Sequence, residues 1–200
     1  MQESTRSIAP IRSSWRVVDI VVASVLAVAT GVVFWAWSLA YGGAAALFVA
    51  FPPLAGLYTG GWLIAGVLGA LIIRKPGAAL YCEVLASAVS GVLGTQFGLS
   101  VLLSGAIQGL GAELVFLLFL YRKFTLPVAL LAGLGAGLFL GVSESILYMP
   151  EWALQWRVLY TVFAMVSGLL LAGLLSWLAV RALARTGVLS AFASGRTADA

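Results

Sequence analysis

The sequence predicts an all-α, polytopic membrane protein with six transmembrane helices and both termini in the cytoplasm. Of its 200 residues, 62% are hydrophobic and only 9% are charged, whereas about a quarter of a soluble domain is charged. Apolar stretches recur along the chain, and about 20 apolar residues are enough to cross a bilayer. These observations exclude a soluble globule, and the basic residues between the stretches indicate the number of crossings.

The basic residues also predict the topology. Cytoplasmic segments of membrane proteins carry an excess of Lys and Arg. With six crossings and a cytoplasmic amino terminus, ten of the eleven basic residues fall inside, and only Arg157 falls outside. An odd number of crossings does not place so many on one side. We therefore expect a cytoplasmic segment at 1–16, a six-helix transmembrane domain at 17–183 and a cytoplasmic tail at 184–200.

Six apolar segments provide the crossings. We expect them at 17–40, inside 44–73, and at 76–94, 105–121, 126–147 and 158–180. The uncharged stretch 44–73 would be roughly 45 Å long as one straight helix, which exceeds a hydrocarbon core of about 30 Å. It must tilt or break. Proline and glycine favour a break at Pro52-Pro53 and at Gly60-Gly61.

The chain offers little enzyme chemistry. It has no histidine, and Cys82 is its single cysteine, which excludes a disulfide, a Cys/His zinc site and a catalytic Ser-His or Cys-His pair within the chain. It also lacks the GxxxxGK[ST] loop that cradles ATP phosphates. We expect no enzyme activity, metal site or cofactor. We expect no nucleic-acid partner either, because the basic residues lie between apolar spans and not on one face.

The most informative stretch is 105–121, where an amide and a carboxylate interrupt an apolar helix. At about 100° per residue, Gly109 and Ala112 form a narrow strip of small residues, which Gln108 and Glu113 flank. This pattern predicts a slot for a flat ligand. The alternative is close helix packing through the glycines, which leaves a costly carboxylate in hydrocarbon unexplained.

Two further carboxylates and a tryptophan complete the candidate substrate-binding site. Helical rise puts Glu83 and Glu113 each roughly 11 Å from the inner surface, so both can face one cavity, with Glu144 nearer its outer mouth. Trp62 follows the second expected break and can stack on a ligand ring. With Gln108, these groups suit an organic cation or an amidine-like heterocycle. The alternative is that the acids are protonated or bonded to neighbouring helices.

Small residues line one face of the first helix. Ala23, Ala27 and Gly31 recur at four-residue spacing, and such a stripe allows another helix to approach closely. The stripe predicts either a docking face for a partner subunit or packing within the bundle.

Two motifs resemble a known family. The sequence IIRKPGAAL at 72–80 with Glu83, followed by IQGLGAELVF at 107–116, is similar to the hydroxymethylpyrimidine/thiamin S components (YkoE-type) of energy-coupling factor (ECF) transporters. The resemblance covers about 15–187. It implies a six-helix subunit in a prokaryotic plasma membrane, which works with a transmembrane coupling subunit and two cytoplasmic ATPase subunits. Ala23 and Ala27 match the AxxxA with which such subunits meet the coupling subunit.

We therefore expect a binding subunit for thiamin or its hydroxymethylpyrimidine precursor. Glu83 and Glu113 would bond to the aminopyrimidine, Gln108 would orient it and Trp62 would stack on it. The partner subunits would hydrolyse ATP. The alternative is a proton-coupled secondary carrier in which a buried glutamate takes up a proton in each cycle, although no inverted repeat is found.

Overall fold

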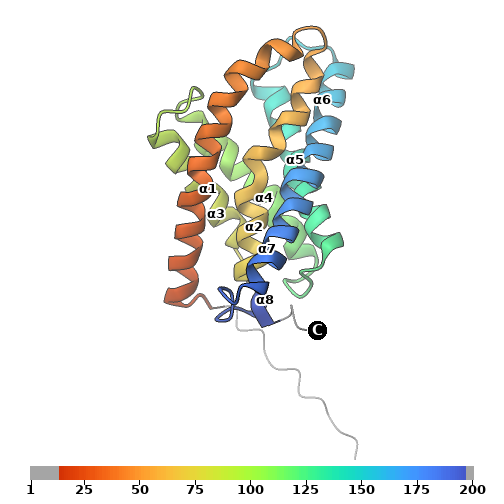
Figure 1. Cartoon of the computed structure of the whole chain (residues 1–200). Coiled ribbons are helices and arrows are strands. Elements are labelled where there is room, and N and C mark those ends of the chain that lie inside the picture. Colours follow the sequence, from red (N-terminus) through yellow and green to blue (C-terminus); the bar gives the residue numbers. More distant parts are fainter. Residues whose placement is uncertain (1–13, 197–200) are drawn as a thin grey trace, which may run out of the picture.

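The computed structural model describes residues 14–196, and every regular element in this part of the chain is a helix. The elements form an elongated bundle, with α1 along one side and α7 leading to α8 at the lower end (Figure 1). They are, in chain order, α1 (Val17–Ala44), η1 (Ala45–Phe48), η2 (Pro52–Leu63), α2 (Ile64–Ile73), α3 (Ala78–Val92), α4 (Ser100–Leu118), α5 (Leu126–Leu147), α6 (Leu154–Ser167), η3 (Gly168–Leu174), α7 (Leu175–Arg185) and α8 (Ala193–Arg196). Here η1 and η2 are 3₁₀ helices, and η3 is a π-helix.

The chain is a multi-pass helical membrane protein. By length and composition, 5 segments can cross a membrane: Val17–Phe48, Pro52–Ile73, Ser100–Leu118, Leu126–Leu147 and Leu154–Arg185. The apolar helix α3 is shorter. Its 15 residues span about 22 Å, less than a hydrocarbon core of about 30 Å.

The stretch that was expected to break does so at the prolines. The first helix continues through η1 to Phe48, and the chain then turns back. Pro52 begins η2, at a first-turn position where the N–H that proline lacks would have no partner within the helix. At Gly60-Gly61 the backbone does not turn, but remains a 3₁₀ helix until α2 begins at Ile64. These glycines serve close packing instead, since a Cβ on Gly60 would lie 2.5 Å from the Ser167 carbonyl oxygen.

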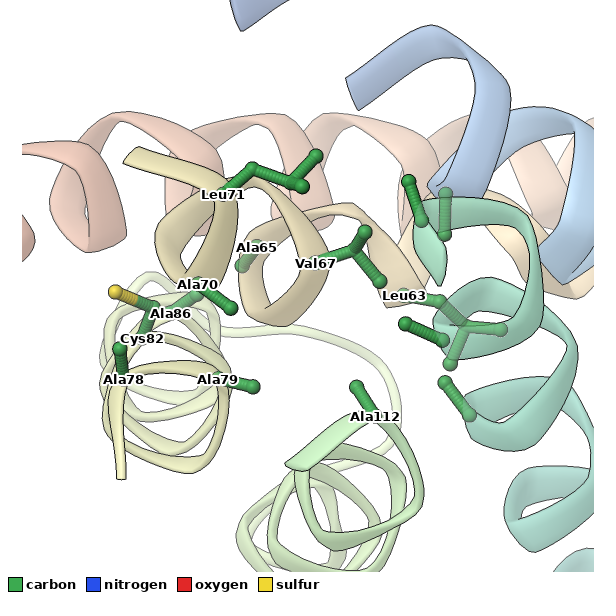
Figure 2. Packing of buried hydrophobic residues seen from close by; sticks show 14 of the residues in the cluster. Leu63, Ala65, Val67, Ala70, Leu71, Ala78, Ala79, Cys82, Ala86 and Ala112 are labelled. Carbon is green, nitrogen blue, oxygen red and sulfur yellow. The ribbon is translucent and has the colours of Figure 1, made fainter. Parts of the chain in front are cut away.

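Helix α3 packs against α1, α2 and α4 through small side chains. Ala78, Ala79, Cys82 and Ala86 are fully buried on α3, and Figure 2 shows them beside the buried residues of α2, with Ala112 of α4 close by. Since lipid supplies little hydrophobic drive for helix association, such close backbone approach supplies van der Waals contact in its place.

The small-residue stripe of α1 belongs to this packing. Ala23 and Ala27 have no exposed surface, the Cys82 thiol lies 3.7 Å from the Ala23 carbonyl oxygen, and a Cβ on Gly31 would lie 2.6 Å from the Val89 Cβ. The docking role expected for Ala23 and Ala27 is therefore corrected. Both alanines face α3 inside the bundle, and the opposite side of α1 carries the exposed valines.

The last crossing packs closely on α5. Ala164, Gly168 and Ala172 are buried, as their four-residue spacing suggests. A Cβ on Gly137 of α5 would lie 2.8 Å from the Met165 Cα. The π-helix η3 lies at this contact, within the otherwise α-helical segment.

Both described ends of the chain lie at the same end of the bundle (Figure 1). The Arg16 guanidinium lies 5.8 Å from the centre of the Phe192 ring, and the Trp15 indole donates to the Pro76 carbonyl at 2.9 Å. Buried Asp19 pairs with Arg16 and Lys75. This ion pair ties the start of α1 to the turn between α2 and α3.

Candidate substrate-binding site

A cavity of about 320 Å³ lies toward the end of the bundle opposite the described termini. Its size is within the range of small-molecule sites, about 300–1,000 Å³. Its lining comes from six helices and two adjoining loops. The residues are Phe34, Ser38 and Tyr41 of α1; Ala55, Thr59 and Trp62 of η2; Ser87 and Ser90 of α3; Phe97 of the loop before α4; Ser100, Val101, Ser104 and Gln108 of α4; Glu144 of α5; Tyr148 and Met149 just after α5; and Tyr160 of α6. Most of its surface is apolar or aromatic, and among the described residues the lining contains one carboxylate and no cation.

Glu144 supplies that carboxylate. It lies in the last turn of α5, and its Oε2 atom accepts a hydrogen bond from the Tyr160 hydroxyl of α6. Tyr160 is in turn buried, with its ring 6.1 Å from Trp152. The carboxylate is thus held by one hydroxyl, while its position in the lining leaves it able to accept a second hydrogen bond from a ligand.

Three aromatic rings stand together at the cavity. The Trp62 ring lies 5.6 Å from Tyr41 and 5.6 Å from Phe97, in edge-to-face geometry. The Trp62 indole donates to the Ser38 hydroxyl at 3.0 Å and to the Phe34 carbonyl at 3.3 Å. The single N–H donor of the indole is shared between these two acceptors on α1, and this holds the ring in one orientation. Such a cluster can stack on a flat ring or attract an organic cation.

Gln108 brings an amide to the same cavity. It is 5% exposed, and its side chain has no hydrogen-bonding partner within residues 14–196, although its amide carries both donors and an acceptor. Ser87 and Ser104 add hydroxyls to the lining nearby. Because the side chain lines the cavity, its amide can both donate to and accept from a polar ligand.

Glu113 does not line the cavity. Its carboxylate accepts hydrogen bonds from the backbone N–H groups of Gly77, Ala79 and Leu80, at 2.5, 2.9 and 3.2 Å, and from the Tyr121 hydroxyl at 2.7 Å. The three N–H groups belong to the start of α3, where helix donors lack partners and negative charge is favourable. The carboxylate therefore caps a neighbouring helix, as the alternative interpretation of the sequence allowed.

Glu83 is also outside the lining. It is fully buried between α2 and α3, and its Oε2 atom accepts from the Gly66 N–H at 2.6 Å. Its Oε1 atom has no partner among the described residues. The sequence placed Glu83 and Glu113 in one cavity from their equal depth, but depth does not determine which way a side chain points around its helix.

The slot expected between Gln108 and Glu113 is filled by α3. A Cβ on Gly109 would lie 3.0 Å from the Glu83 Cβ and 3.1 Å from the Leu80 Cα, and Ala112 is buried. The strip therefore packs against a helix. Of the predicted site residues, the structure brings together Trp62, Gln108 and Glu144.

Several lining residues were missed or interpreted differently from sequence. Tyr41, Phe97, Tyr148 and Tyr160 line the cavity, but none of them was among the predicted site residues. A belt residue and a cavity residue look alike in sequence, since both are aromatics near helix ends. Tyr160 had one usable signal, because a buried tyrosine hydroxyl usually needs a partner.

Comparison with known proteins supports a transport role. A family model described as "ABC-type cobalt transport system, permease component" matches residues 18–139. A protein of Bacillus subtilis (strain 168), described as "Putative HMP/thiamine permease protein YkoE", is 38% identical over 190 residues, which cover 92% of each chain. The chain belongs to the YkoE-type S components of ECF transporters. A solved structure described as "Crystal structure of an S-component of ECF transporter" is 36% identical, with a TM-score of 0.83 over 92% of this chain and 93% of the other.

As an S component, the chain is the substrate-binding membrane subunit of an ECF-type importer. The similarity to the Bacillus protein extends over 92% of the chain. The family model matches residues 18–139, a range that includes the cavity residues from Phe34 to Gln108.

Proposed function

We propose that this S component binds thiamin or its hydroxymethylpyrimidine precursor in the cavity around Glu144. The observation that carries the proposal is one cavity whose lining contains the carboxylate of Glu144, the Gln108 amide and the aromatic cluster around Trp62. The description of the Bacillus relative as an HMP/thiamine permease supports the same substrate class.

The chemistry of the ligand matches these groups. An aminopyrimidine has an exocyclic amine that can donate to Glu144 and ring nitrogens that can accept from the Gln108 amide. Trp62 and its neighbours Tyr41 and Phe97 can stack on the pyrimidine, and in thiamin the cationic thiazolium ring can lie against an aromatic face. We assign Glu83 and Glu113 to support of α2 and α3, not to ligand contact.

A bare cobalt ion fits the cavity less well, despite the description of the matching family model. Among the described residues, the lining offers one carboxylate and no histidine or cysteine, and no group of three such side chains is suited to a metal. Transition-metal sites are normally built from several such ligands.

The membrane arrangement that we propose has six crossings, with α3 as the short one, and with residues 1–16 and 184–200 on the cytoplasmic side. Support comes from the basic residues, since Arg16, Lys75 and Arg181 lie at the end of the bundle where both described termini meet. In the plasma membrane of a prokaryote, a transmembrane coupling subunit and two cytoplasmic ATPases would complete the importer. ATP hydrolysis would belong to those partners, and this chain would bind without catalysing a reaction.

Calorimetry on the purified S component tests the substrate assignment. We expect saturable binding of thiamin or hydroxymethylpyrimidine and weaker binding by Glu144→Gln. Loss of a hydrogen bond to a charged group costs on the order of 1.5–3 kcal/mol, about ten- to a hundredfold in affinity. Glu151→Gln, at an exposed residue of the loop after α5, is the matched control.

Two results would overturn the assignment. One is saturable binding of Co²⁺ with no binding of either pyrimidine compound. The other is unchanged pyrimidine affinity in Glu144→Gln when its thermal stability equals that of the wild type.

A further inference from the structure

A second recess lies at the opposite end of the bundle from the substrate cavity. Its volume is about 410 Å³, and it is bounded by the end of α2, the loop between α4 and α5, one face of α7 and Ser194 of α8. Arg74, Arg122, Lys123 and Arg181 all line it, beside the aromatic residues Phe124 and Trp177. The substrate-binding function proposed above does not involve this recess.

The recess is strongly basic. Among residues 14–196, its lining contains four cations and no carboxylate. The described acids are engaged or distant, since Asp19 pairs with Arg16 and Lys75 and Glu113 caps α3. Basic residues that only determine topology need to lie on the cytoplasmic side of the membrane. Topology alone does not explain why four of them surround one recess.

Two of the cations are held in place. The Arg74 guanidinium lies 5.3 Å from the Phe124 ring centre and donates to the Leu71 carbonyl at 3.2 Å, and Arg181 lies 4.7 Å from the Trp177 ring centre. Arg122 and Lys123 are exposed at the rim. The recess thus combines two arginines held by aromatic rings with two exposed charges on long side chains, a set that can contact an anion from several directions.

A helix end adds to the positive potential. Thr125, in the lining, is the N-cap residue of α5, and its side chain makes no capping hydrogen bond. The first N–H groups of this 22-residue helix therefore lack an acceptor from Thr125, and a helix N-terminus favours a negative group.

The position of the recess indicates the kind of anion. Its basic residues follow the ends of the apolar helices α2 and α4 and lie on α7, and basic residues at the ends of membrane-spanning helices are expected near the lipid headgroups. Leu118 at the end of α4 and Leu178, which follows the lining residue Trp177 on α7, are exposed, and exposed leucines of this kind can contact acyl chains. Basic pockets between transmembrane helices bind acidic lipid headgroups.

We propose that this recess binds the phosphate headgroup of an anionic phospholipid, such as phosphatidylglycerol. The lipid would bridge the α4–α5 loop and α7, with its phosphate among the four cations and its chains along the exposed leucines. The site is independent of the substrate cavity, and the proposal does not rest on the identity of the imported compound.

Native mass spectrometry of the purified chain in neutral detergent tests this proposal. Phosphatidylglycerol and phosphatidylcholine with identical acyl chains are titrated separately, and the apparent Kd of the first bound lipid is compared. The variant Arg122→Gln/Lys123→Gln removes two exposed charges whose side chains form no hydrogen bond or ion pair with residues 14–196. Arg185→Gln is the matched control, since it removes one exposed charge from the same end of α7 outside the lining.

We expect the wild type to prefer phosphatidylglycerol. Each basic residue near an anionic headgroup contributes about fivefold in affinity, so the double variant should lose roughly 25-fold for phosphatidylglycerol and little for phosphatidylcholine. Arg181→Gln should lose about fivefold, whereas Arg185→Gln should behave as the wild type. Equal thermal stability of the variants in lipid-free detergent shows that the fold is retained.

Three outcomes would overturn the proposal. Equal affinity of the wild type for the two lipids would show that the headgroup charge is not recognised. Displacement of phosphatidylglycerol by millimolar inorganic phosphate would assign the recess to a free anion. Unchanged lipid binding by the double variant, together with failure to co-purify with the coupling subunit, would assign it to a protein partner.

Discussion

Glu113 and Glu144 are both carboxylates within apolar helices, but their surroundings assign them different roles. Glu113 accepts four hydrogen bonds from the protein, three of them from the start of α3. Glu144 accepts one from Tyr160 and lines the cavity. A carboxylate whose acceptor sites are occupied by the protein stabilises the fold, whereas one with open sites can bind a ligand.

At the residue scale, we predict that Glu113→Gln lowers stability and leaves ligand affinity unchanged. An amide has one oxygen where the carboxylate has two, so at least one donor at the start of α3 loses its acceptor, at a cost of roughly 1–3 kcal/mol. Thermal unfolding and calorimetry on one preparation measure both effects. A loss of affinity at unchanged stability would return Glu113 to the binding site.

At the element scale, the contact between α1 and α3 depends on small side chains. We predict that Ala23→Leu/Ala27→Leu lowers the unfolding temperature and ligand binding together, because both alanines are fully buried and overpacking costs about 1–3 kcal/mol at each site. Val25→Leu/Val28→Leu adds bulk on the exposed face of the same helix and serves as the control. If the alanine variant keeps its stability and ligand affinity but loses the coupling subunit, the buried packing is wrong.

The 3₁₀ helix η2 presents a second test at this scale, because it carries Thr59 and Trp62 to the cavity. Gly60 lies so close to α6 that a Cβ would stand 2.5 Å from the Ser167 carbonyl oxygen. Gly60→Ala should therefore displace η2, weaken ligand binding by at least several-fold and lower the unfolding temperature. Gly43→Ala, where a Cβ meets nothing within 4 Å, should leave both unchanged. Wild-type affinity in Gly60→Ala, measured by calorimetry, contradicts the positioning role of η2.

At the scale of the whole molecule, the bundle separates its two chemical features. The substrate cavity lies toward one end, and the basic recess lies at the other, where the described termini meet (Figure 1). A binding subunit of an importer needs a partner to supply energy, and this chain has no phosphate-binding loop of the GxxxxGK[ST] type.

We predict that uptake into liposomes requires the coupling subunit and active ATPases, whereas the isolated chain binds ligand without accumulating it. The physical reason is that binding alone cannot drive a solute against its gradient. Radiolabelled uptake with and without ATP, in the complete complex and in an ATPase-inactive one, measures this dependence. Accumulation by the chain alone under an imposed proton gradient would favour the secondary carrier.

The sequence by itself determined the helical membrane class, the segment 126–147 to the residue, the turn at Pro52 and the family, because length, hydropathy, proline and motif order are local properties. It also singled out Trp62, Gln108 and Glu144, three side chains that now line one cavity. Only the tertiary structure decided that Ala23 and Ala27 face α3, that Glu113 caps α3 and that Tyr41 and Phe97 join Trp62. The physical reason is that a helix pattern gives the spacing of side chains along and around one helix. Which neighbour occupies each face is set by how all the helices pack together.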